Sequence, residues 1–171
     1  MNPEILFDAT QIGERIDAIA EAIARAQPLP EVAAPVLAGS FVFAADLLRA
    51  LARRGAMLRV EFLWLRSYGE RRMADREITV LAGPSEGVRG RHVLLLDGVL
   101  DHGRTLARAR ELVAAAGAKS IKTAVAIDKA REQGLMKADF AAFRGIDRFV
   151  VGYGMDLAGE GRTLPYIGAA D

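Results

Sequence analysis

One stretch of the chain reads Val93-Leu-Leu-Leu-Asp97-Gly-Val-Leu-Asp101-His-Gly-Arg-Thr105. Its consecutive apolar residues are typical of a buried strand, and the polar segment after them leads into a helix. This order places two carboxylates and the free N–H groups of a helix N-terminus at the carboxyl end of a strand. Ligands of open α/β sheets bind at such an edge, and a helix N-terminus favours a phosphate. The stretch therefore predicts an α/β fold with a site for a phosphorylated sugar.

Strands and helices alternate along most of the chain. Apolar residues at helical spacing predict a helix from Thr10 to Ala26 with Thr10 as its N-cap. We expect further helices over residues 41–54 and 105–116, and strands over residues 32–37, 57–65, 77–82, 92–96, 120–127 and 148–153. Residues 66–75 are polar and charged, which predicts a mobile loop. The alternation indicates one α/β domain, residues 1–171, with a mostly parallel central sheet flanked by helices.

Composition narrows the classes of function. The 171 residues carry a net charge of +1 at pH 7, so the charge balance does not indicate a nucleic-acid or membrane partner. The chain has no cysteine and two histidines, which excludes disulfides and argues against a zinc site. The first residues contain neither a basic segment nor a long apolar run, so we expect no signal peptide and a cytoplasmic protein.

The opening stretch resembles the ribose-phosphate motif of the type I phosphoribosyltransferases. In that family two acidic residues follow an apolar strand and precede Asp-Thr-Gly-(Lys/Arg)-Thr; here the second acid is Gly98 and the usual Thr is His102. Taken alone, the residues also fit an ordinary strand-to-helix turn, where Asp and Gly are common. The run Gly103-Arg104-Thr105 at a helix start favours the functional interpretation, because its N–H groups form an anion site.

Two further segments resemble the hypoxanthine-guanine branch of this family. Residues 37–40, Leu-Ala-Gly-Ser, resemble its pyrophosphate turn, with Ala38 where the family has Lys, and imply a cis peptide between Leu37 and Ala38. Residues 67–69, Ser-Tyr-Gly, resemble the start of its lid. Without the resemblance, the first segment is only a turn and the second a surface hairpin.

Motifs near the C-terminus resemble the same branch. Lys137-Ala-Asp-Phe resembles the context of the purine-contacting Lys, although a single Lys is more often a solvated charge. Phe149-Val-Val-Gly-Tyr-Gly-Met-Asp156 and Arg162-Thr-Leu-Pro-Tyr-Ile-Gly168 occur together at the family's spacing. The matches follow the family's order from Val36 to Gly168, and a series is less expected by chance than one motif.

The resemblance implies a type I phosphoribosyltransferase fold with a flexible strand–loop–strand lid and a small hood formed by the terminal segments. It implies purine salvage: a 6-oxopurine (hypoxanthine, guanine or both) and 5-phosphoribosyl-1-pyrophosphate (PRPP) give a nucleoside monophosphate and pyrophosphate. It further implies Mg²⁺ as cofactor, small-molecule substrates as the partners, and a homodimer or homotetramer.

Each site residue also follows from the resemblance. Asp101 is the implied general base, and Asp97 and Asp156 the implied Mg²⁺ ligands. The implied contacts are Asp97, Asp101, His102, Gly103, Arg104 and Thr105 for the ribose 5′-phosphate; Ala38, Gly39 and Arg162 for pyrophosphate; Lys137, Phe149, Val150 and Asp156 for the purine; and Ser67 and Tyr68 for the lid.

Gly98, Ala38 and the altered lid keep an alternative open: a catalytically weakened or regulatory phosphoribosyltransferase-like protein that binds a nucleotide. Loss of one hydrogen bond to a charged group is worth roughly 1.5–3 kcal/mol, which weakens binding about tenfold or more without preventing catalysis. An enzyme for another base, such as xanthine, is a third possibility. Retention of four residues favours an active enzyme: Asp101, Lys137, Asp156 and Arg162.

Overall fold

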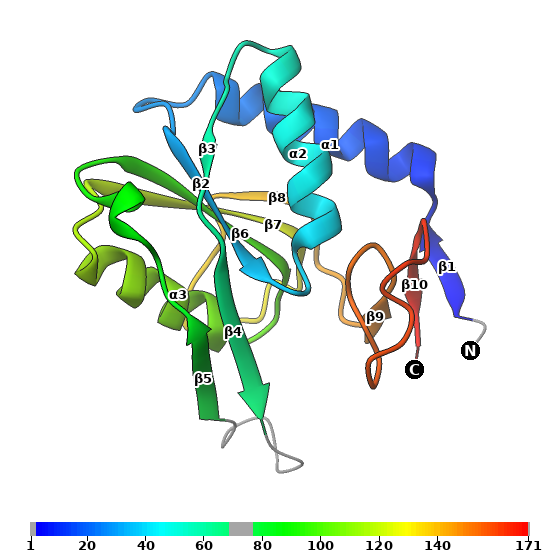
Figure 1. Ribbon diagram of the computed structural model, residues 1–171. Helices are drawn as coiled ribbons and strands as arrows, with labels where there is room; N and C mark the ends of the chain where they lie inside the picture. The colour runs from blue at the N-terminus through cyan, green and yellow to red at the C-terminus, as the bar shows by residue number, and fades with distance from the viewer. Residues whose placement is uncertain (1–2, 69–76, 171) are drawn as a thin grey trace.

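A computed structural model describes residues 3–68 and 77–170, and its central layer is one mostly parallel sheet (Figure 1). The strand order is β5-β4-β2-β6-β7-β8, with β3 also paired to β2. The strands are β2 (Val32–Leu37), β3 (Arg59–Val60), β4 (Leu63–Tyr68), β5 (Glu77–Ala82), β6 (His92–Leu100), β7 (Ser120–Asp128) and β8 (Phe140–Arg144). Among the described strands of this sheet, only β4 and β5 pair in antiparallel fashion, so the sheet is mostly parallel, as predicted.

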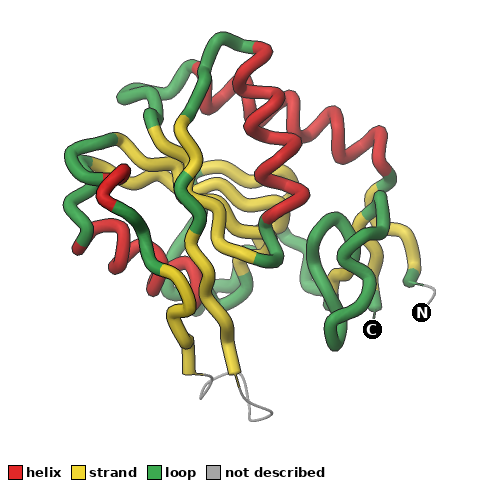
Figure 2. The backbone as a smooth tube through the Cα atoms, viewed as in Figure 1, coloured by secondary structure: helices red, strands yellow, loops and turns green. Residues whose placement is uncertain are grey.

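Helices cover both faces of this sheet (Figures 1 and 2). Helices α1 (Ala9–Ala24) and α2 (Phe41–Arg53) lie on one face, and α3 (Arg104–Ala115) lies on the other. Side chains of β6 alternate between the two apolar layers: Leu94 and Leu96 pack with α1 and α2, whereas Val93 and Leu95 pack with α3. A strand buried on both faces needs apolar residues at every position, which explains the continuous apolar run.

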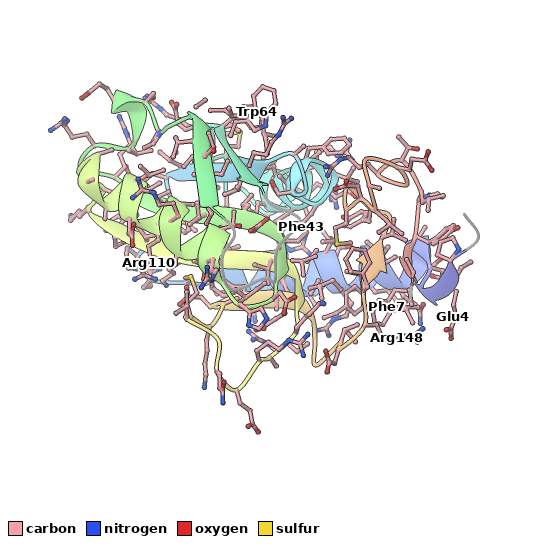
Figure 3. The ribbon with its side chains drawn as sticks, turned by 90° about the horizontal axis from the view of Figure 1, so that it is seen from below. Glu4, Phe7, Phe43, Trp64, Arg110 and Arg148 are labelled. Atoms are coloured by element: carbon pink, nitrogen blue, oxygen red, sulfur yellow. The ribbon has the colours of Figure 1, made fainter. Side chains whose placement is uncertain are left out.

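The terminal segments form a separate antiparallel sheet, the predicted hood. It consists of β1 (Glu4–Phe7), β10 (Ile167–Ala169) and β9 (Val150–Val151), in that order. The rings of Phe7 and Phe143 stack with centroids 3.8 Å apart, and so join β1 to the segment of β8. Figure 3 shows Glu4 and Arg148 on this side of the molecule, where they form an ion pair of 3.2 Å.

Two sequence predictions were wrong about strands. The strand expected over residues 148–153 is only Val150–Val151, and it belongs to the hood. The strand beside β7 at one edge of the main sheet is β8, whose two alanines give it a weak strand signal. The single strand expected over residues 57–65 is divided into β3 and β4.

Two other boundaries differ from the prediction. Helix α1 is capped by Asp8 rather than Thr10: the Asp8 carboxylate accepts the Gln11 N–H at 2.9 Å, and the Gln11 side chain accepts the Asp8 N–H at 3.0 Å. These reciprocal bonds form a capping box. Strand β6 continues to Leu100 because it pairs with β7 over its whole length, so Asp97 lies inside a strand rather than in a loop.

The lid prediction lies largely outside the described residues. Ser67 and Tyr68 are the last residues of β4, and residues 69–76 are not described. Within residues 3–68 and 77–170, no helix has the length and apolar character needed to cross a membrane.

Replacement of Phe43 by Ala tests the larger apolar layer. Phe43 is fully buried among α1, α2 and β6 (Figure 3), and truncation of such a side chain leaves a cavity. We expect a loss of about 3–5 kcal/mol in the free energy of unfolding, measured by urea denaturation. Met57→Ala is the control, because this side chain is 86% exposed and its truncation should cost little.

Candidate active site

The carboxyl ends of three adjacent parallel strands meet at one edge of the sheet. Strand β6 pairs with β2 on one side and with β7 on the other, and Leu100 is in register with Asp128. The turn after β2, the segment after β6 and the segment after β7 therefore emerge side by side. This edge, the C-terminal rim, holds most of the predicted site residues.

Residues 102–105 form the turn that opens α3. Gly103 is the N-cap with φ 82°, a left-handed conformation that suits glycine. Among the described residues, no side chain caps the first helical turn. The His102 carbonyl accepts the Leu135 N–H at 3.0 Å, which fixes the turn from behind. A helix N-terminus without a capping side chain keeps backbone donors for an anion. Arg104 is exposed and Thr105 half-buried beside these donors.

Asp101 lies in a cluster of cationic side chains. Its carboxylate accepts a 2.9 Å hydrogen bond from Arg131 Nε, and Lys129 Nζ lies 3.4 Å away. A third neighbour, His102, has its Nε2 at 3.8 Å from the same carboxylate. Burial raises the pKa of Asp101, but the Arg131 hydrogen bond and the surrounding positive charges outweigh burial and hold the pKa below its usual value. Asp101 is therefore ionised at neutral pH.

Asp97 lies on β6, close to Asp101 in sequence, but its environment is the opposite. One carboxylate oxygen accepts the N–H of Gly98 at 2.7 Å. Among the residues that the structure describes, no cation forms an ion pair with Asp97. Burial raises its pKa to about 7, and the Gly98 hydrogen bond offsets only part of that effect. A ligand that brings a cation or hydroxyl donors to Asp97 would compensate for this burial.

The turn after β2 contains the cis peptide between Leu37 and Ala38 that the resemblance implied. Ser40 is buried, and its hydroxyl donates to the Val36 carbonyl at 2.7 Å. Ala38 is exposed, so the turn presents backbone rather than the family's Lys side chain at this position. Gly39 packs its carbonyl against both Gly98 and Gly154.

The hood brings two charged site residues to the same place. The Arg162 guanidinium donates to the Gly154 carbonyl at 2.8 Å and forms a 2.6 Å ion pair with Asp156. The other Asp156 oxygen accepts the Gly159 N–H at 2.8 Å. Because Gly154 touches the turn at Gly39, the pair Asp156–Arg162 is anchored beside that turn. Phe149, which precedes the buried Val150, is 42% exposed.

Lys137 is placed differently from the rest of the predicted set. It is exposed and lies two residues before Asp139, whose carboxylate accepts the backbone N–H and hydroxyl of Thr123 at 2.8 and 2.9 Å. Thr123 lies in the middle of β7, so this bond holds the segment along the strand rather than at its carboxyl end. The contact of Lys137 with a purine remains a prediction.

Lys129 is the residue that the sequence reasoning missed. It directly follows β7, its side chain is only 8% exposed, and it pairs with Asp101. The signal was present in the sequence, because a charged residue after a buried apolar strand lies at the carboxyl end of that strand. The same reasoning applies to Arg131, which lies just after this strand as well. Arg131 forms ion pairs with Asp101 and with Asp147.

Comparison with known proteins agrees with this geometry. The phosphoribosyl transferase domain family matches residues 4–158. The chain belongs to the phosphoribosyltransferase family. It is 37% identical to the hypoxanthine phosphoribosyltransferase of Escherichia coli (strain K12) over 134 residues, 78% of this chain and 74% of that protein. It is 34% identical to the hypoxanthine-guanine phosphoribosyltransferase of Bacillus subtilis (strain 168) over 167 residues, 96% of this chain and 91% of that protein.

Solved structures of this phosphoribosyltransferase family have the same fold. The hypoxanthine phosphoribosyltransferase from Trypanosoma cruzi in complex with the product IMP superimposes with a TM-score of 0.84 at 31% sequence identity, over 98% of this chain and 94% of that chain. The central sheet with its separate small antiparallel sheet is therefore the type I phosphoribosyltransferase fold, as the sequence predicted.

Replacement of Asp97 by Asn tests the buried carboxylate. The folded-state pKa of about 7 lies above the ordinary 3.8, so the unfolded chain releases its proton first as the pH rises. Stability therefore falls between these two values, and the penalty is complete above about pH 7. Without divalent cations, we expect the Asn variant to gain roughly 2 kcal/mol over wild type between about pH 4 and about pH 8, measured by urea denaturation.

Asp17→Asn is the matched control for this measurement. Asp17 is an exposed carboxylate whose pKa is lowered, first by its hydrogen bond from Arg54. Its removal should give no gain at high pH, because a lowered pKa contributes stability that is present above the ordinary value. An Asp97→Asn variant whose stability follows that of wild type at every pH would contradict the burial argument.

Proposed function

We propose that the protein is a purine-salvage phosphoribosyltransferase that joins hypoxanthine, guanine or both to the ribose 5-phosphate of PRPP. The bond from the anomeric carbon to pyrophosphate breaks, the bond to the purine nitrogen forms, and a purine ring proton leaves. The observation that carries the proposal is the convergence at the C-terminal rim of an uncapped helix N-terminus, an ionised Asp101 and the Gly39 turn. The relatives' activities support it.

Asp101 is the proposed general base. Its lowered pKa keeps the carboxylate ionised, and it follows directly on the strand that leads into the phosphate turn. The sugar develops positive charge as pyrophosphate departs, as in glycoside hydrolysis, and this charge makes the purine proton easier to remove. Lys129 and Arg131 orient the carboxylate, since their nitrogens lie 3.4 and 2.9 Å from its oxygens.

The purine is proposed to lie between this cluster and the hood. Phe149 offers an exposed ring for stacking, and the backbone of Val150 offers hydrogen-bonding groups for the edge of the base. Lys137 and Asp156 complete the proposed purine contacts. A site that donates a hydrogen bond to the 6-oxygen would discriminate against adenine, which has an amino group there.

The phosphates have separate proposed sites. The backbone and side chains of residues 102–105 hold the 5′-phosphate, and Asp97 binds the ribose hydroxyls directly or through a metal. The turn Ala38–Gly39 and Arg162 hold pyrophosphate. Ser67 and Tyr68, at the end of β4, are the proposed start of a lid that excludes water from the reacting sugar.

Mg²⁺ is the proposed cofactor. Within the described ranges, no three carboxylate or imidazole groups come together as a ready-made metal site. This fits Mg²⁺, which keeps several waters and is commonly bound by one or two carboxylates together with substrate phosphates. Asp97 has an unpaired carboxylate for this purpose, whereas Asp156 is already engaged by Arg162. The ion would neutralise charge on the departing pyrophosphate.

The protein is further proposed to form a homodimer or homotetramer and to act in the cytoplasm. Val60, Phe62 and Trp64, on or between β3 and β4, are 40%, 56% and 44% exposed, and Figure 3 shows Trp64 at the outer edge of the molecule. Exposed apolar side chains that lie together commonly mark association surfaces. The mixed surface charge argues against nucleic acid as a partner, and a chain without cysteine suits a reducing compartment.

An absorbance assay with PRPP and Mg²⁺ tests the function. We expect turnover with hypoxanthine or guanine and none with adenine, and comparison with xanthine identifies the preferred base. Failure of all four bases, together with retained binding of a nucleoside monophosphate, would support the regulatory alternative that Gly98 and Ala38 keep open.

Replacement of Asp101 by Asn tests the general base. Loss of a positioned base slows the chemical step by at least about 10²-fold. We therefore expect kcat to fall by that factor while the KM for PRPP changes much less, measured by initial rates. Asp17→Asn provides the control for an exposed carboxylate on α1. Wild-type kcat in the Asp101 variant would remove its assignment as base.

Removal of Mg²⁺ tests the proposed cofactor. A chelator should abolish turnover, because pyrophosphate then leaves without a neutralising cation. Added Mg²⁺ should restore the rate, and Asp97→Asn should require more Mg²⁺ for half-maximal activity. Full activity in excess chelator would rule out the metal.

A further inference from the structure

Gly98 occupies the position where the family motif has its second acid, and the structure shows what fills the space. A Cβ atom at Gly98 would lie 2.6 Å from the Gly39 carbonyl oxygen and 3.1 Å from its carbon. Both atoms belong to the backbone, so no rotation of a side chain could relieve the contact. Gly98 is therefore a glycine at which another part of the backbone approaches closely.

Gly154 approaches the same carbonyl from the hood. A Cβ there would lie 2.9 Å from the Gly39 oxygen, and its φ of +97° is a conformation that favours glycine. The Gly39 carbonyl is thus enclosed between Gly98 on β6 and Gly154 in the hood. In contrast, a Cβ built on Gly39 itself would meet no atom of residues 3–68 and 77–170 within 4 Å, which leaves room for a ligand on that side of the turn.

Hydrogen bonds fix the hood side of this enclosure. Gly154 donates its N–H to the Arg162 carbonyl at 2.9 Å and accepts from the Arg162 guanidinium at 2.8 Å. The neighbouring Tyr153 hydroxyl donates to Asp46 of α2 at 2.8 Å. Helix α2 begins directly after the turn, so the enclosure and the turn are attached to the same helix.

We propose that Gly98 is a positioning residue for pyrophosphate rather than a lost acid. Together with Gly154, it forms a seat for the Gly39 carbonyl. A trans peptide directs its carbonyl and its N–H to opposite sides, so the seated carbonyl also fixes the direction of the Ser40 N–H at the start of α2. This inference rests on the proposed function insofar as the turn at residues 38–40 holds pyrophosphate.

Three variants test whether Gly98 positions the Gly39 carbonyl or only marks the loss of a carboxylate. They are Gly98→Ala, Gly98→Asp and the control Gly83→Ala. A Cβ at Gly83 would meet none of the described atoms within 4 Å, and Gly83 lies after β5, outside the proposed site. The affinity for inorganic pyrophosphate with Mg²⁺ is measured by calorimetry, and the KM values for PRPP and for the base by initial rates.

If Gly98 and Gly154 hold the Gly39 carbonyl in place, both Gly98 variants should lose affinity for pyrophosphate, because the added Cβ displaces the turn. We expect pyrophosphate affinity to fall, and the KM for PRPP to rise, between about tenfold and about 10²-fold, the effect of small misplacements in a site. The KM for the base should change far less, and Gly83→Ala should match wild type. A Gly98→Asp variant that binds pyrophosphate as well as or better than wild type would overturn the inference.

A second measurement needs no variant and covers the case in which Gly98→Ala does not fold. In a crystal structure of the wild-type protein with Mg²⁺ and pyrophosphate, the Gly39 carbonyl should stay between Gly98 and Gly154. A carbonyl that turns out of this seat, or a wild-type protein that does not bind pyrophosphate, would overturn the inference. Pyrophosphate binding without turnover of any base would contradict only the proposed function.

Discussion

Burial of β6 on both faces is the constraint on which the rest of the structure depends. Leu94 and Leu96 complete one apolar layer and Leu95 the other, so the strand can occupy only the middle of the sheet. Its parallel partners β2 and β7 then end at the same edge. This single packing requirement brings three chain segments, distant in sequence, to one rim.

Two carboxylates from the same segment acquire opposite properties at this rim. Asp97 remains within the strand, where burial without a cation raises its pKa to about 7. Asp101 lies just past the strand end, where Arg131 and Lys129 reach it and the pKa falls. The lower pKa of Asp101 arises chiefly from Arg131 and Lys129, which the segment after β7 contributes. One carboxylate is thereby suited to a ligand that brings its own cation, and the other stays ionised beside its cationic neighbours.

The hood is joined to this rim by backbone packing as well as by side chains. The contact of Gly154 with the Gly39 carbonyl and the bond from Tyr153 to Asp46 connect the C-terminal segment to the turn and to α2. The absence of a side chain at Gly98 is, in this arrangement, compatible with closer packing around the turn after β2. A departure from the family motif therefore has a steric explanation in the structure.

The sequence by itself determined the features that depend on local pattern. The apolar run before Asp97, the helix start at Gly103–Thr105 and the order of motifs were sufficient for the fold, the family resemblance and most of the candidate site. Only the tertiary structure decided that β8 is an edge strand of the main sheet, that residues 150–151 belong to the hood, and that Lys129 meets Asp101. These outcomes depend on strand pairing and on contacts between segments far apart in sequence, for which hydrophobic periodicity carries no signal.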